Sequence, residues 1–168
     1  MTISMYQASV PVCTRALNNL IAILDKAKAH AEAKKIEPDV FVSCRLIADM
    51  HPLSRQIQIA SDVAKNGIAR LAGAEPPSFP DEEKTLAELV ERLKKTVKYL
   101  ESFKPAQIDG TEDKTVTMKI GPNTMEFQGQ PYLLNFILPN VFFHVTTAYD
   151  ILRENGVDIG KRDFLGGV

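Results

Sequence analysis

The segment from residue 130 to residue 156, QPYLLNFILPNVFFHVTTAYDILRENG, constrains the fold of this chain more than any other. It is a long apolar run with helical spacing, and polar residues stand in it where a core helix usually has none. Pro131 suits the first position of a helix, and Gly156 suits the position just after its end. We therefore predict a long central helix, interrupted at Pro139, against which the rest of the chain packs.

Three further segments have the apolar period of amphipathic helices: residues 4–35, 52–71 and 85–100. In the first, Pro11 predicts either a kink or the true start of the helix. The second begins at Pro52, so His51 is expected at its edge rather than inside it. In the third, Thr85 and Glu88 have the T-x-x-E spacing of a capping box. Together with the central helix, these segments predict a mainly helical bundle of four helices.

The region between residues 104 and 129 changes its period from helical to alternating. Val116, Met118 and Ile120 fall on one side of TVTMKI, and Met125 and Phe127 alternate again after Gly121-Pro122-Asn123. This pattern predicts a short β-hairpin inserted before the last long helix. The C-terminal tail, VDIGKRDFLGGV, has no regular period; we expect it to lie along the bundle, with a local ion pair within its Lys-Arg-Asp triplet. The whole chain, residues 1–168, is expected to form one domain.

The faces of the central helix differ in chemistry. At 100° per residue, Asn140 and His144 share one flank of the buried stripe, whereas Phe142 and Phe143 point to the opposite side. Two adjacent phenylalanines on an outer face suggest a surface that something covers. A homodimer contact is the simplest cover; the hairpin or the tail is the alternative.

Composition excludes several classes of partner. The chain has 20 basic and 21 acidic residues, so no field of one sign favours nucleic acid or an anionic membrane. No apolar run reaches the roughly 20 residues of a membrane span. The N-terminus lacks the pattern of a secretory signal, and two cysteines do not make a disulfide framework. We therefore expect a cytoplasmic protein that binds neither nucleic acid nor membrane.

The chemistry that the sequence suggests is limited. His144 is the best candidate for a functional histidine because it lies on the central helix, although a lone histidine there is more typical of a hydrogen-bonded core or interface residue. Asn140 is a weak ligand for zinc or nickel but a good hydrogen-bond partner; it could also satisfy the carbonyl that Pro139 leaves free. His51 could join them only if the start of the second helix lies beside the middle of the fourth. The chain has no nucleophile elbow, Walker loop, dinucleotide-binding glycine motif or C-x-x-C.

Four strings make the pattern recognisable: MYQASVPV, DMHPLSRQIQIA, LPNVFFHVTTAYDILRENGV and GKRDFLG. On them, residues 5–166 resemble a family of bacterial proteins of unknown function within the DinB/YfiT-like superfamily. The resemblance implies a DinB-like four-helix bundle, commonly dimeric. In metal-binding members, one histidine of the second helix and two from an H-x-x-x-H motif on the fourth hold a divalent ion such as nickel or zinc. Some relatives use that ion to activate a small thiol.

This chain departs from that motif. The fourth-helix motif reads Asn140-x-x-x-His144, so an amide stands where the first histidine of the motif would be, and His51 is the one histidine near the second helix. Replacing an imidazole by an amide should lower affinity for a transition metal sharply. Two hypotheses follow: a homodimeric bundle with a degenerate metal or small-molecule pocket near Asn140 and His144, or a divalent-metal-dependent thiol-transfer enzyme that uses His51 and His144. In the second, a carboxylate such as Asp49 could complete the site.

Overall fold

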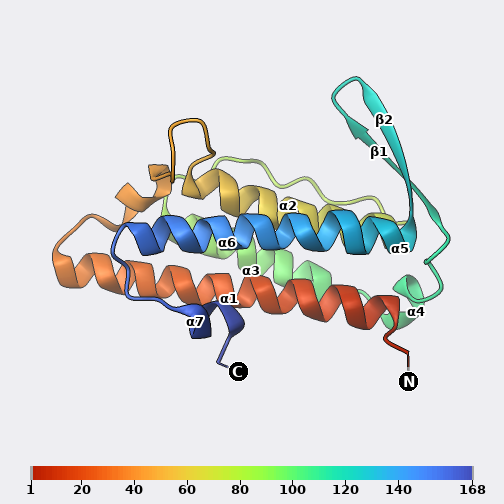
Figure 1. The fold of residues 1–168 in the computed structure, drawn as a ribbon, viewed down its shortest axis with the longest axis horizontal. Coiled ribbons are helices and arrows are strands. Elements are labelled where there is room, and N and C mark those ends of the chain that lie inside the picture. Colours follow the sequence, from red (N-terminus) through yellow and green to blue (C-terminus); the bar gives the residue numbers. More distant parts are fainter. Residues whose placement is uncertain (1, 168) are drawn as a thin grey trace.

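Four long helices form the body of the protein in a computed structural model that describes residues 2–167. They are α1 (Met5–Lys34), α2 (Leu53–Ala72), α3 (Leu86–Glu101) and α6 (Leu138–Glu154). Helices α1 and α2 each pack against both α3 and α6, so α1 and α2 are diagonal to one another (Figure 1). The predicted mainly helical four-helix bundle with one small hairpin is confirmed.

The helix ends follow from the local sequence. Ser4 caps α1 by accepting a hydrogen bond from the Gln7 amide at 3.2 Å, so Pro11 lies within the helix and does not mark its start. The predicted capping box of α3 is present, with the Glu88 amide donating to Thr85 Oγ1 at 3.1 Å. Pro52 is the residue directly before α2, which leaves His51 outside the helix as expected. A short 3₁₀ turn, η1 (Pro38–Ser43), lies in the connection from α1 to α2.

Helices α2 and α3 run in the same direction, and the segment 73–85 crosses back along the bundle to join them (Figure 1). Two buried cations hold this crossover. The guanidinium of Arg92 donates to the Pro80 carbonyl at 2.9 Å, and the Lys65 ammonium donates to the Pro77 carbonyl. Phe79 lies between Lys65 and Lys95, whose Nζ atoms are 4.4 and 4.0 Å from the ring centroid. The prolines of the crossover prevent a helix there, and the cations bind the carbonyls that this leaves unpaired.

The hairpin consists of β1 (Thr115–Ile120) and β2 (Asn123–Gln128), paired antiparallel with Thr115 opposite Gln128. It projects from one end of the bundle, next to the short helices α4 (Pro105–Ile108) and α5 (Gly129–Pro131) (Figure 1). Val116 and Met118, which the alternation puts on one side of the strand, are both buried. The Phe127 ring packs 5.3 Å from that of Tyr132 and thereby joins the hairpin to the fourth helix.

The predicted break at Pro139 takes the form of a π-helical turn, η2 (Tyr132–Ile137), directly before α6. The Leu138 amide donates to the Leu133 carbonyl, five residues back instead of four. Proline lacks an amide hydrogen, and in a regular α-helix its ring would clash with the carbonyl four residues earlier. The wider turn lets the helix continue past Pro139. At the end of this turn, the side chain of Ile137 packs closely against Gly67 of α2. A Cβ added to Gly67 would lie 2.7 Å from the Ile137 side chain.

The end of α6 and the packing of the tail along the bundle match the sequence expectation, whereas the ion pair of the tail does not. Gly156 has φ 86°, and the Val157 amide donates to the Leu152 carbonyl at 3.1 Å, as in a Schellman motif. The tail then forms a short helix, α7 (Lys161–Leu165), which packs on α1. Its Asp163 pairs with Lys26 of α1 at 2.6 Å, so the local ion pair expected within the tail is replaced by one that ties the tail to the bundle.

Candidate functional site

His144 is buried on the face of α6 that packs against α2. Its Nδ1 lies 2.6 Å from Oε1 of Gln56, whose side chain is itself almost fully buried. The Gln56 amide nitrogen donates to the carbonyl of His51 at 3.1 Å, which turns Oε1 toward the imidazole. Because Oε1 can only accept, His144 carries its proton on Nδ1. The Nε2 lone pair is therefore left to accept a hydrogen bond or to bind a ligand.

The imidazole of His144 is neutral at physiological pH. Burial lowers its pKa, and the charges of His51 and Arg55 lower it further, to about 4. A protonated imidazole at this position would lose its hydration without gaining an acidic partner. His144 therefore acts as a neutral group, whose Nε2 can accept a hydrogen bond or bind a ligand, and not as a charged group.

The structure brings together the residues that the sequence singled out. His51 lies exposed just before α2, and its charge acts on His144, so the two histidines share one neighbourhood. Asn140 is half-buried one turn before His144 on α6. Within residues 2–167 the Asn140 side chain forms no hydrogen bond with the protein, so it does not satisfy the carbonyl left by Pro139. Its amide remains available beside the imidazole.

Two residues of this site, Gln56 and Arg55, were missed by sequence reasoning. The Arg55 guanidinium is paired with Asp81 of the crossover and contacts Gln58 at 3.4 Å, which fixes a positive charge near His144. A signal for Gln56 was present: it falls three residues after Leu53 and four before Ala60, within the buried stripe of α2. A polar residue at such a position requires a buried partner.

The donor set suits a metal ion only weakly. Catalytic zinc sites usually have three imidazole, thiolate or carboxylate ligands, whereas this site has two imidazoles and one amide. In the described part of the chain, no three side chains of histidine, cysteine, aspartate or glutamate converge on a point that could hold an ion. Asp49 is exposed in the connection and belongs to no such cluster.

The two cysteines do not have the environment of a nucleophile. Burial raises the pKa of the Cys13 thiol to about 12. Burial also raises the pKa of Cys44, and the nearby Glu154 carboxylate raises it further. Both thiols are free and stay protonated at neutral pH.

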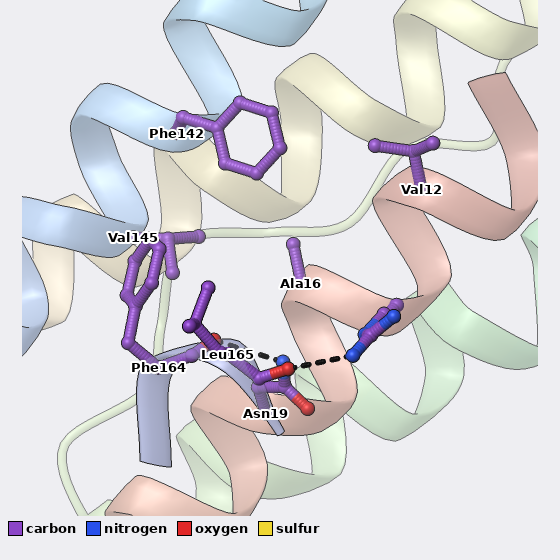
Figure 2. A pocket seen from close by; sticks show the side chains of 8 residues that line it. Val12, Ala16, Asn19, Phe142, Val145, Phe164 and Leu165 are labelled. Carbon is purple, nitrogen blue, oxygen red and sulfur yellow. Dashed lines mark hydrogen bonds between the residues drawn. The ribbon is translucent and has the colours of Figure 1, made fainter. Parts of the chain in front are cut away.

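A separate concave region lies on another face of α6, between α1, α6 and α7 (Figure 2). This pocket has a volume of about 390 Å³. Phe142 forms one wall and is 38% exposed, whereas Phe143 is 56% exposed and its ring packs edge-on against His144 at 5.2 Å. The phenylalanine pair is therefore divided: α7 flanks Phe142, and neither the hairpin nor the tail buries Phe143.

Residues 5–165 match the family described as Domain of unknown function (DUF1993). The chain belongs to this family. It is also similar to a solved structure, the crystal structure of a DinB family member protein from Shewanella denitrificans, with 42% sequence identity and a TM-score of 0.87. That similarity covers 97% of this chain and 92% of the other. The resemblance predicted from the four strings is confirmed at the level of family and fold.

No curated protein matches the chain. Among the helices of residues 2–167, none combines the length and the apolar character that crossing a membrane requires.

Proposed function

We propose that the protein is a small-molecule-binding bundle whose site is formed by His51, Asn140 and His144 at the contact of α2 with α6. The observation that carries this proposal is the fixed tautomer of His144, because Gln56 occupies Nδ1 and leaves Nε2 with a free lone pair. Asn140 adds an amide that can donate and accept. The site thus suits a polar ligand that donates a hydrogen bond to Nε2, with the positive charge of Arg55 nearby.

A second candidate is a divalent-metal-dependent enzyme of the thiol-transferase type that uses His51 and His144. One observation favours it: a metal-binding histidine usually donates its other ring N–H to an oxygen, as His144 does to Gln56. Nickel or zinc would then bind Nε2, with Asn140 and His51 as further ligands. The amide in place of a third strong ligand weighs against this candidate and places it second.

Metal analysis separates the two candidates. Protein purified without a histidine tag is dialysed against excess Ni²⁺ or Zn²⁺ and then against buffer, and the retained metal is measured for the native chain and for His144→Ala. Under the first proposal neither protein retains stoichiometric metal. Stoichiometric nickel or zinc that is lost in His144→Ala would contradict it and support the enzyme. His30→Ala serves as the control, because His30 lies on α1 and belongs to neither candidate site.

We further propose that the protein is a homodimer in the bacterial cytoplasm. The contact residue is Phe143, which is more than half exposed on the central helix of the bundle. The free thiols of Cys13 and Cys44 suit a reducing compartment. Sedimentation velocity at micromolar concentration should give a dimer for the native chain and a monomer for Phe143→Ser. Leu134→Ser, which removes another exposed apolar side chain, should leave the dimer intact. A monomeric native protein would refute this part of the proposal.

A further inference from the structure

The pocket between α1, α6 and α7 lies apart from the histidine site, and its walls come from three elements. Figure 2 shows the labelled side chains of α1, α6 and α7 gathered around one space. Its volume of about 390 Å³ lies within the range of small-molecule sites. The apolar walls are formed by Val12, Ala16, Phe142, Val145, Phe164 and Leu165.

The wall formed by α7 is held in place by specific contacts. Asn19 Nδ2 donates to the Phe164 carbonyl at 2.9 Å (Figure 2). Arg15 Nη2 donates to the Leu165 carbonyl at 2.8 Å. Gly166, with φ 76°, lies so close to Asn19 that a Cβ would be 2.3 Å from Asn19 Oδ1. A side chain at residue 166 would therefore displace the Asn19 side chain and break its hydrogen bond to α7. These contacts make the pocket a built feature of the fold.

One charged group lines this apolar pocket, the guanidinium of Arg15. Within residues 2–167 it forms no ion pair, and the Leu165 carbonyl is its one hydrogen-bond acceptor, although a guanidinium has five N–H donors. Glu101 lines an adjoining concavity together with Arg15, and no ion pair joins the two side chains in the described part of the chain. The pocket thus combines apolar walls with one solvent-exposed guanidinium that pairs with no carboxylate in the described part of the chain.

We propose that this pocket binds an amphipathic monocarboxylate, a small molecule with a hydrocarbon body and one carboxylate. The hydrocarbon contacts the rings of Phe142 and Phe164 and the side chain of Leu165, whose apolar surface it removes from water. The carboxylate accepts charge-assisted hydrogen bonds from Arg15. A neutral amphiphile would leave the guanidinium without an anion, so the pocket discriminates by charge as well as by shape.

Calorimetric titration with decanoate, below the concentration at which it forms micelles, tests this proposal. We expect saturable binding of one equivalent per chain, and binding of decanol at least tenfold weaker. Arg15→Met should weaken decanoate binding roughly tenfold to a hundredfold, the range expected for a lost hydrogen bond to a charged group, and leave decanol binding unchanged. Arg153→Met is the matched control, because Arg153 also donates to a carbonyl, that of Val157, but lies outside the pocket.

A second variant tests the pocket without removing the hydrogen bond from Arg15 to α7, because Arg15→Met could weaken binding by loosening α7. Val12→Trp places a large ring on the half-buried rim of the pocket and should abolish binding of both amphiphiles in a protein with native circular dichroism. His144→Ala should leave decanoate binding unchanged, which separates this inference from the histidine site. Three results would overturn the proposal. Decanoate could bind no better than decanol, or it could bind Val12→Trp as well as it binds the native chain. It could also fail to bind because a second copy of the chain covers the pocket.

Discussion

Arg92 is the residue whose replacement should cost the most stability outside the apolar core. Its side chain is 2% exposed, and its guanidinium lies 2.9–3.0 Å from carboxylate oxygens of Asp62, Asp81 and Glu83. Burial would lower the pKa of the guanidinium, but the hydrogen bond to Glu83 and the charges of the three carboxylates outweigh burial and raise it. Arg92→Met keeps much of the volume but removes the cation that three carboxylates share, although Arg55 stays paired with Asp81 and Lys65 with Asp62.

The size of the effect follows from how exposed those carboxylates are. Breaking a buried ion pair by removing one partner usually costs about 3–5 kcal/mol. The side chains of Asp62 and Asp81 are 30% and 38% exposed, and Lys65 stays 3.3 Å from Asp62, so the lower end of that range applies, about 3 kcal/mol. With a urea dependence of about 2 kcal/mol per molar for a chain of this size, the unfolding midpoint should fall by about 1.5 M.

Urea denaturation followed by circular dichroism measures this shift. Lys94→Met is the control, because Lys94 is on the same helix and pairs with Glu91 at the surface, where an ion pair contributes little. Adding Asp62→Asn and Glu83→Gln to Arg92→Met should restore part of the loss, since these changes reduce the negative charge that Arg92 no longer balances. If Arg92→Met shifts the midpoint no more than Lys94→Met does, the crossover is not held by this cluster and the reasoning fails.

Two further predictions concern α3 and the histidine site. Thr85→Ala removes the oxygen that accepts from the Glu88 amide and should cost about 1 kcal/mol in the free energy of unfolding; an unchanged midpoint would contradict the assigned start of α3. His144 has a pKa of about 4 in the folded chain against an ordinary 6.5, so the unfolded chain binds more protons between those values and stability falls as pH decreases from 6.5 to 4. The expected loss over this window is about 2–3 kcal/mol, and His144→Gln should lack it; equal pH profiles for the two proteins would show that His144 titrates normally.

The helices could be predicted because their signals are local. Thr85 and Glu88 define a cap within four residues, and Gly156 ends α6 by its own backbone conformation. The position of His51 just outside α2 follows from Pro52 in the same way. Such features depend on neighbours in the chain, and the sequence shows those neighbours directly.

The remaining features depend on partners far apart in the chain. Arg92 lies in α3 at a position typical of a solvated face, and its burial requires the crossover to fold back over it. The short helix α7 has no apolar period of its own and is held by Lys26 and Asn19 of α1. The tautomer of His144 depends on Gln56, which is 88 residues away. No pattern within a single helix reveals these contacts.

The π-helical turn before Pro139 also sets the rotation of the first part of the fourth helix, about the helix axis, relative to α6. It has one more residue than an α-helical path would need, and each residue turns the chain by about 100°. Deleting one residue from 132–137 would regularise the helix but would rotate the hairpin about the helix axis by that angle. Tyr132 and Phe127 would then turn together away from Phe136, which both rings contact, while His144 kept its place against α2. The turn therefore sets the direction of the hairpin independently of the site.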